Sequence, residues 1–146
     1  MFTIDKTLEI EAPAATVWQV LTDFAAYGQW NPFVPECRCE LKPGGAIEMQ
    51  VQLMAKPQFQ REFVREVQPG QGFSYSMKPA PLGLLSSFRS HRIEPLGPTR
   101  CRYTSHFELR GPMRHLVLAL FRGALEKGFA GMSAGVKQRA ESLAKR

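Results

Sequence analysis

The most informative feature of the sequence is a change in the spacing of its apolar residues near Pro112. In most segments before Pro112, apolar residues alternate with polar ones, as Ile47, Met49 and Val51 do with the residues between them. From Pro112 to about Ala144, apolar residues recur every three or four positions instead. A period of two is typical of strands with one buried face, and a period of about 3.6 is typical of an amphipathic helix. The chain is therefore predicted to form a sheet followed by one long terminal helix.

Turn residues divide the first part of the chain into seven segments with strand character. Pro and Gly separate several of them, as in the turns Pro43-Gly44-Gly45 and Gly97-Pro98. Because connections this short cannot carry the chain across a sheet, neighbouring strands are predicted to run antiparallel. The predicted strands are Phe2–Ile10, Cys37–Leu41, Ile47–Leu53, Phe59–Val67, Phe73–Met77, Ser86–Leu96 and Thr99–Leu109.

Two short helices are predicted between the first and second strands. Pro13 suits the first position of a helix, where its missing N–H costs nothing, and Val17 and Leu21 follow at helical spacing. A second short helix is predicted from Phe24 to Trp30, because the aromatic residues in this stretch lie three positions apart. We expect the large aromatic side chains of this short segment to pack against a concave apolar surface elsewhere in the protein.

The terminal helix is predicted to differ between its two halves. The segment His115–Phe121 is apolar almost all round, whereas Lys137 and the residues after it flank a narrow apolar stripe. We therefore expect the first half to lie deepest in the protein and the second half to lie on the surface. The predicted apolar stripe consists of Val117, Leu118, Phe121, Leu125, Phe129, Met132, Val136 and Leu143.

Size and charge narrow the classes of protein to consider. A chain of 146 residues suits one domain, so residues 1–146 are expected to form a single unit. The net charge is +6, but the basic residues are scattered, and we do not expect binding to nucleic acid. The longest apolar run, Leu116–Phe121, is far shorter than the ~18 residues of a membrane span, so no integral membrane segment is expected. The N-terminal residues contain no apolar run that could serve as a signal peptide, which favours a cytoplasmic location.

The sequence indicates neither metal nor cofactor chemistry. Cys37, Cys39 and Cys101 are an odd number of thiols and are predicted to be unpaired. No other metal-ligating residue falls at a recognised spacing from them. The glycine-rich phosphate loop, the dinucleotide-binding motif, the hydrolase nucleophile elbow and the zinc-protease motif are all missing. We therefore expect no cofactor and no bound metal.

Four polar side chains are predicted to lie on the apolar face of the last two strands. The alternation of residues places Arg89, His91, Tyr103 and Ser105 together on this face. His91 could exchange protons near neutral pH, Tyr103 could donate a hydrogen bond to a carbonyl, and Arg89 could hold an enolate or a carboxylate. This chemistry suits a cyclase, an aromatase or a dehydratase. The alternatives are a structural hydrogen-bonded cluster, or a β-bulge that turns Arg89 and His91 to solvent.

One strand, two short helices, six strands and a long helix is the order found in the START-like, or SRPBCC, superfamily. Three stretches of the sequence also resemble that superfamily: IEAPAATVWQVLTDFAAYGQWNPF, HRIEPLGPTRCRYTSHFELRG and EKGFAGMSAGVKQRAES. The likeness spans essentially the whole chain and is to the bacterial polyketide cyclase/dehydrase-like and lipid-transport-like group. It implies an α+β helix-grip fold: a curved seven-stranded antiparallel sheet wrapped around the long C-terminal helix, with two short helices after the first strand.

The resemblance further implies an apolar cavity between the sheet and the terminal helix. The function that the resemblance implies for the protein is binding or carriage of an apolar small molecule such as a lipid, a polyketide or an aromatic compound. Two alternatives stay open: a cyclase/dehydratase-like enzyme that uses His91, Tyr103 and Arg89 in the same cavity, and a co-chaperone-like module that binds another protein. A homodimer also stays open. The residues expected at the cavity are Trp30, Phe33, Met49, Val51, Phe63, Tyr75, Ser105, Phe107, Phe121, Leu125 and Phe129.

Overall fold

The computed structural model describes residues 1–146 and contains every strand and helix that the sequence predicts. The strands are β1 (Phe2–Ile10), β2 (Glu36–Cys39), β3 (Ala46–Val51), β4 (Gln58–Gln68), β5 (Gly72–Met77), β6 (Ser86–Gly97) and β7 (Arg100–Arg110). The helices are α1 (Ala14–Thr22), α2 (Arg114–Ala144) and two short 3₁₀ helices, η1 (Phe24–Gln29) and η2 (Pro81–Gly83). Only η2 has no counterpart among the predicted elements.

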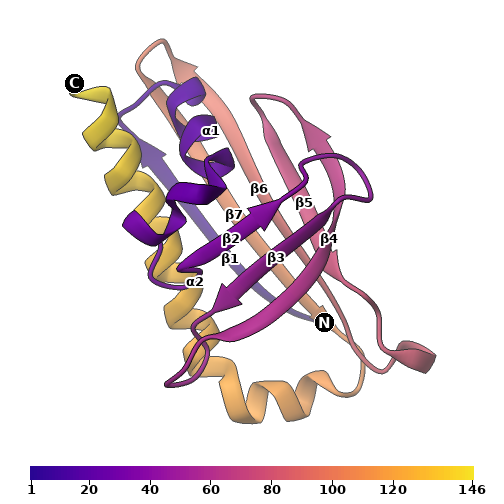
Figure 1. Cartoon of the computed structure of the whole chain (residues 1–146). Coiled ribbons are helices and arrows are strands. Elements are labelled where there is room, and N and C mark those ends of the chain that lie inside the picture. The colour runs from indigo at the N-terminus through magenta and orange to yellow at the C-terminus, as the bar shows by residue number, and fades with distance from the viewer.

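The seven strands form one antiparallel sheet in the order β1-β7-β6-β5-β4-β3-β2. β1 pairs with β7, and the other strands follow one another as neighbours in sequence order. The sheet is strongly curved, so that β2 and β3 lie in front of β7 and β1 in the view of Figure 1. α2 runs along the open side of this curve, where it contacts β1, β7 and α1 (Figure 1). This arrangement confirms the predicted helix-grip fold.

The core lies between the concave face of the sheet and the helices, and it is one cluster of 25 buried residues. The early apolar segment supplies part of it, because Val17 and Leu21 of α1 are fully buried and Tyr27 of η1 is almost so. The Tyr27 hydroxyl donates a 2.6 Å hydrogen bond to the carbonyl of Leu21, which ties the two short helices together. The two short helices therefore pack together against the sheet, α1 on β6 and β7 and η1 on β2.

The burial of α2 is the reverse of the prediction. The first half was expected to lie deepest, yet Leu116 is 57% exposed and Leu120 is 66% exposed. The second half was expected on the surface, yet Met132, Val136 and Ala140 are almost completely buried. The physical reason is the placement of the helix: its first turns extend beyond the strands in Figure 1, whereas its later turns pack on β1 and α1.

The orientation of β4 also differs from the prediction. Phe63 was expected to face the interior, but it is 36% exposed and lies on the outer face of the sheet, so that expectation is wrong. Val64 is buried instead, and Glu62 shares its inward face. A bulge shifts the register between Val64 and Glu66, so the inward face changes parity along the strand. A period-two pattern read through this bulge assigns the wrong face to the residues before it.

Candidate functional site

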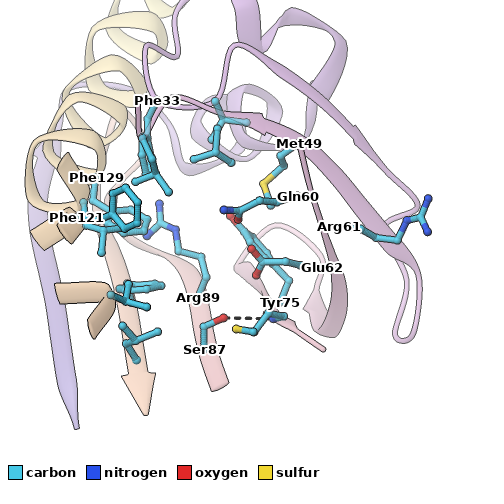
Figure 2. Close-up of a pocket in the computed structure, with 18 of the residues that line it drawn as sticks. Phe33, Met49, Gln60, Arg61, Glu62, Tyr75, Ser87, Arg89, Phe121 and Phe129 are labelled. Atoms are coloured by element: carbon cyan, nitrogen blue, oxygen red, sulfur yellow. Dashed lines mark hydrogen bonds between the residues drawn. The ribbon is translucent and has the colours of Figure 1, made fainter. Parts of the chain in front are cut away.

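The main pocket lies between the concave face of the sheet and the first half of α2, and its volume is about 470 Å³. Residues from five strands and from α2 line it, and 15 of the 21 lining residues are hydrophobic. The aromatic walls come from Phe33, Phe121 and Phe129, whereas polar side chains enter from β4 and β6 (Figure 2). A mostly apolar cavity of this size with a few polar groups is typical of a site for a small organic molecule.

Most of the residues expected at the cavity line this pocket. Three do not: Trp30, Phe63 and Ser105. The Trp30 ring packs on Tyr27 and on Gly135 of α2, and Ser105 lies behind Arg89 as its hydrogen-bond partner. Phe63 faces outward, as described above. The expected residues that do line the pocket are Phe33, Met49, Val51, Tyr75, Phe107, Phe121, Leu125 and Phe129.

His91 and Tyr103 form a buried pair outside the pocket. The hydroxyl of Tyr103 lies 2.7 Å from Nδ1 of His91, and the two rings stack with their centroids 5.9 Å apart. Neither residue lines the pocket, and the rings of Phe73 and Tyr75 pack against His91. Burial holds the pKa of His91 well below its usual value, with the charge of Arg89 acting in the same direction. The other ring nitrogen of His91, Nε2, is buried without a hydrogen-bond partner.

Arg89 enters the pocket from β6 although only 3% of its surface is exposed (Figure 2). Its Nη1 donates a hydrogen bond to Oγ of Ser105, and its Nη2 lies 3.4 Å from the sulfur of Met132. The guanidinium carbon lies 4.5 Å from the centre of the Phe129 ring, a cation–π contact. Its Nε has no hydrogen-bond partner, and no carboxylate lies within ion-pair distance of it. A buried positive charge therefore faces the pocket with only neutral partners.

Glu62 is the most important of the pocket residues that sequence reasoning missed, because its carboxyl can titrate inside the pocket. It projects into the pocket from β4, beside Gln60 (Figure 2). Burial raises the pKa of the Glu62 carboxyl to about 7, and the positive charge of Arg89 only partly opposes this rise. The alternation of Gln60, Glu62 and Val64 was the available signal, but the larger apolar residues Phe59 and Phe63 concealed it. At neutral pH Glu62 can therefore both donate and accept a proton inside the pocket.

Other features of the chain add no second chemical centre. Cys37, Cys39 and Cys101 are free thiols, as predicted. No three His, Cys, Asp or Glu side chains lie close enough together to hold a metal ion. None of the helices has the length and apolar character needed to cross a membrane. The pocket, with Arg89 and Glu62, is accordingly the candidate site of function.

Comparisons with known proteins agree with this fold. The sequence matches, over residues 1–145, the model of a family described as polyketide cyclase / dehydrase and lipid transport. No curated protein matches it. A START superfamily protein from Mycobacterium smegmatis is 19% identical, with a TM-score of 0.72 over 97% of this chain and 98% of that one.

Two enzymes share the same architecture. The Zhui aromatase/cyclase from Streptomyces sp. R1128 is 17% identical, with a TM-score of 0.70 over 99% of this chain and 94% of that one. Norcoclaurine synthase from Thalictrum flavum, solved as a point mutant with a transition-state analogue, is 15% identical, with a TM-score of 0.69 over 97% and 95% of the two chains. At these identities the likeness is one of fold.

Proposed function

Because the chain belongs to the polyketide cyclase / dehydrase and lipid transport family, we propose that it binds and carries an apolar small molecule in the pocket beneath α2. The match confirms the superfamily resemblance noted in the sequence. The observation that carries the proposal is the pocket itself, about 470 Å³ in volume and lined mainly by hydrophobic side chains. Apolar walls of this kind favour a lipid, a polyketide or an aromatic compound over a polar metabolite.

Binding is favoured over the catalytic assignment made from the sequence. His91 and Tyr103 were the expected acid–base pair, but both are buried beside the pocket and bond to each other. Only Arg89 of that trio lines the pocket. The lining therefore supports enclosure of a molecule more directly than proton transfer by His91.

A second candidate function, a cyclase- or dehydratase-like reaction, is favoured by Glu62. Its carboxyl has a pKa raised to about 7 by burial, and a general base or acid works best when its pKa lies near the working pH. Arg89, on β6, would then stabilise a developing enolate. In this candidate the proton-transferring group is Glu62 and not His91.

The first test is native mass spectrometry of the freshly purified protein, followed by organic extraction of any released molecule. We expect a stoichiometric apolar companion, and we expect the empty protein to bind the uncharged fluorescent probe N-phenyl-naphthylamine. Val51 lines the pocket from β3, so the larger side chain of Val51→Phe fills part of it. This variant should retain less of the apolar companion and bind the probe more weakly. Gln50→Phe is the matched control, since Gln50 is the preceding residue on the same strand and does not line the pocket.

The results of these experiments distinguish the carrier function from the enzymatic candidate. If neither a companion nor probe binding is found, or if both variants lose binding equally, the proposed carrier function is wrong. If the bound molecule is chemically altered by the wild-type protein but not by Glu62→Gln, the enzymatic candidate replaces it.

A further inference from the structure

Arg89 is the only Lys, Arg, Asp or Glu residue in the protein that is buried. Burying a charge is costly unless an opposite charge or a full set of hydrogen bonds compensates it, and an arginine stays protonated in proteins. The partners of Arg89 here are all uncharged: the hydroxyl of Ser105, the sulfur of Met132 and the ring of Phe129, with the hydroxyls of Tyr75 and Tyr103 also interacting with it. Its Nε has no partner at all. The guanidinium therefore lacks the anionic partner that would stabilise a buried positive charge.

The nearest acidic side chain does not act as this partner. Glu62 lies on β4 and Arg89 on β6, and β5 runs between these two strands. Strands two places apart in a sheet are separated by about 10 Å, so the two side chains enter the pocket with space between them. Both project into the cavity in Figure 2, and no ion pair joins them.

We propose that the molecule bound in the pocket is amphipathic and carries one carboxylate, which pairs with the guanidinium of Arg89. This inference rests on the proposed function and specifies its ligand class. The apolar body of the ligand lies against Phe107, Phe121 and Leu125, and its anionic group lies next to Arg89. An anion there satisfies the free Nε of Arg89 and compensates its charge.

The pairing couples ligand binding to the protonation of Glu62. The positive charge of Arg89 stabilises ionised Glu62 in the empty pocket, and a bound anion offsets that charge. Glu62 then takes up a proton and can donate a hydrogen bond to the ligand. Binding of an anion that stays ionised should therefore strengthen as the pH falls toward about 7, the raised pKa of Glu62 in the empty pocket, and should level off below it.

The other charged or titratable groups around the pocket do not change the direction of this pH dependence. Arg61 forms an ion pair with Glu48 and points away from the cavity (Figure 2), and Lys78 is exposed. Burial raises the pKa of the Tyr75 phenol, so it stays neutral. The lining residues contributed by β3, β7 and α2 carry no titratable side chain.

The test compares two probes of equal chain length that differ only in charge, dodecanoate and dodecanol, by isothermal titration calorimetry of the delipidated protein. We expect dodecanoate to bind about tenfold or more tightly than dodecanol, because a hydrogen bond to a buried charge contributes more than a neutral one. Arg89→Met should remove this preference and leave dodecanol binding nearly unchanged. Arg92→Met is the matched control, since Arg92 lies on the exposed face of the same strand. It should change neither affinity.

A second variant keeps the inference testable should Arg89→Met fail to fold. Glu62→Gln preserves shape and removes the competing carboxylate, so it should tighten dodecanoate binding at about pH 8 and abolish its pH dependence. Equal affinity of the wild-type protein for the acid and the alcohol overturns the anion inference and leaves the carrier function standing. Failure of the wild-type protein to bind either probe overturns both.

Discussion

The two halves of α2 perform different tasks within one continuous helix. The second half is an anchor: Met132, Val136 and Ala140 are almost completely buried, and this part of the helix packs on β1 and α1. The first half is a pocket wall, with Val117, Phe121 and Leu125 lining the cavity. On its other side Leu116 and Leu120 face solvent. The protein therefore packs one end of this helix tightly into its core and uses the other end to line the pocket.

The glycines of α2 show where close packing begins: at Gly128 an added Cβ would collide with the ring of Phe33. At Gly135 an added Cβ would lie 2.6 Å from the backbone carbonyl oxygen of Trp30, so the helix approaches the preceding loop closely there. At Gly123, in the first half, an added Cβ would meet nothing within 4 Å. The first turns of α2, up to about Gly123, therefore have fewer packing contacts to lose, and local opening of the structure is expected to cost less free energy there.

The largest expected effect comes from removing a core contact in the anchoring half. Val136→Ala deletes two buried methyl groups and leaves a cavity, so we expect it to lower the free energy of unfolding by about 2 kcal/mol. Leu120→Ala removes a larger side chain from the exposed face of the pocket-wall half, and we expect a change of about 0.5 kcal/mol or less. Urea denaturation followed by circular dichroism measures both. If the two variants lost equal amounts of unfolding free energy, the proposed difference in packing between the two halves of α2 would be wrong.

The next prediction is that the same substitution, glycine to alanine, changes the free energy of unfolding in opposite directions at two positions of α2. Alanine is favoured over glycine in a helix by about 1 kcal/mol, so Gly123→Ala should stabilise the protein by up to that amount. In Gly135→Ala the same gain is outweighed by the collision with the Trp30 backbone, and we expect a net loss of about 1–2 kcal/mol. Thermal and urea unfolding of the two variants side by side provide the measurement. Stabilisation by both substitutions would show that the second half of α2 is not tightly packed.

The sequence predicted the strands and their antiparallel pairing because alternation and turn residues are local signals. It also placed Arg89 and Ser105 on the inner face correctly, since β6 and β7 pair in regular register through both residues. It failed at β4, where the bulge after Val64 changes the parity that the period-two pattern depends on. It therefore missed Glu62, whose carboxyl lines the pocket.

The depth of α2 could not be predicted for a different reason. An apolar helix segment such as Leu116–Leu120 shows a capacity for burial, but burial also needs a surface to pack against. That surface is set by where the sheet ends, which depends on contacts between residues far apart in the sequence. The early aromatic residues do find such surfaces, because Trp18 and Phe24 pack on Phe73 of β5 and Trp30 packs on Gly135 of α2.

The final prediction contrasts two glutamates, one at the pocket and one at the anchoring half. Burial raises the pKa of Glu62 to about 7 from an unfolded value of 4.5, so the folded state holds a proton more tightly than the unfolded state. Its contribution to stability is therefore greatest below about pH 4.5 and is lost as the pH rises to about 7. Glu141 has a lowered pKa, because it accepts a hydrogen bond from the backbone N–H of Glu11 and pairs with Lys137. Its contribution is present above about pH 4.5 and is lost as the pH falls further.

Urea denaturation between about pH 4 and pH 8 should separate the two glutamates. Relative to the wild type, Glu62→Gln should gain about 1 kcal/mol of stability as the pH rises from about 5 to 8, since the amide removes the cost of ionising a half-buried carboxyl. Glu141→Gln should instead lose stability relative to the wild type above about pH 5, because it removes a favourable carboxylate. Taking each variant as a difference from the wild type cancels the titration of His91, which both variants retain. If the two difference curves had the same sign, Glu62 would be solvated like a surface residue, and the polar end of the pocket would be open to water.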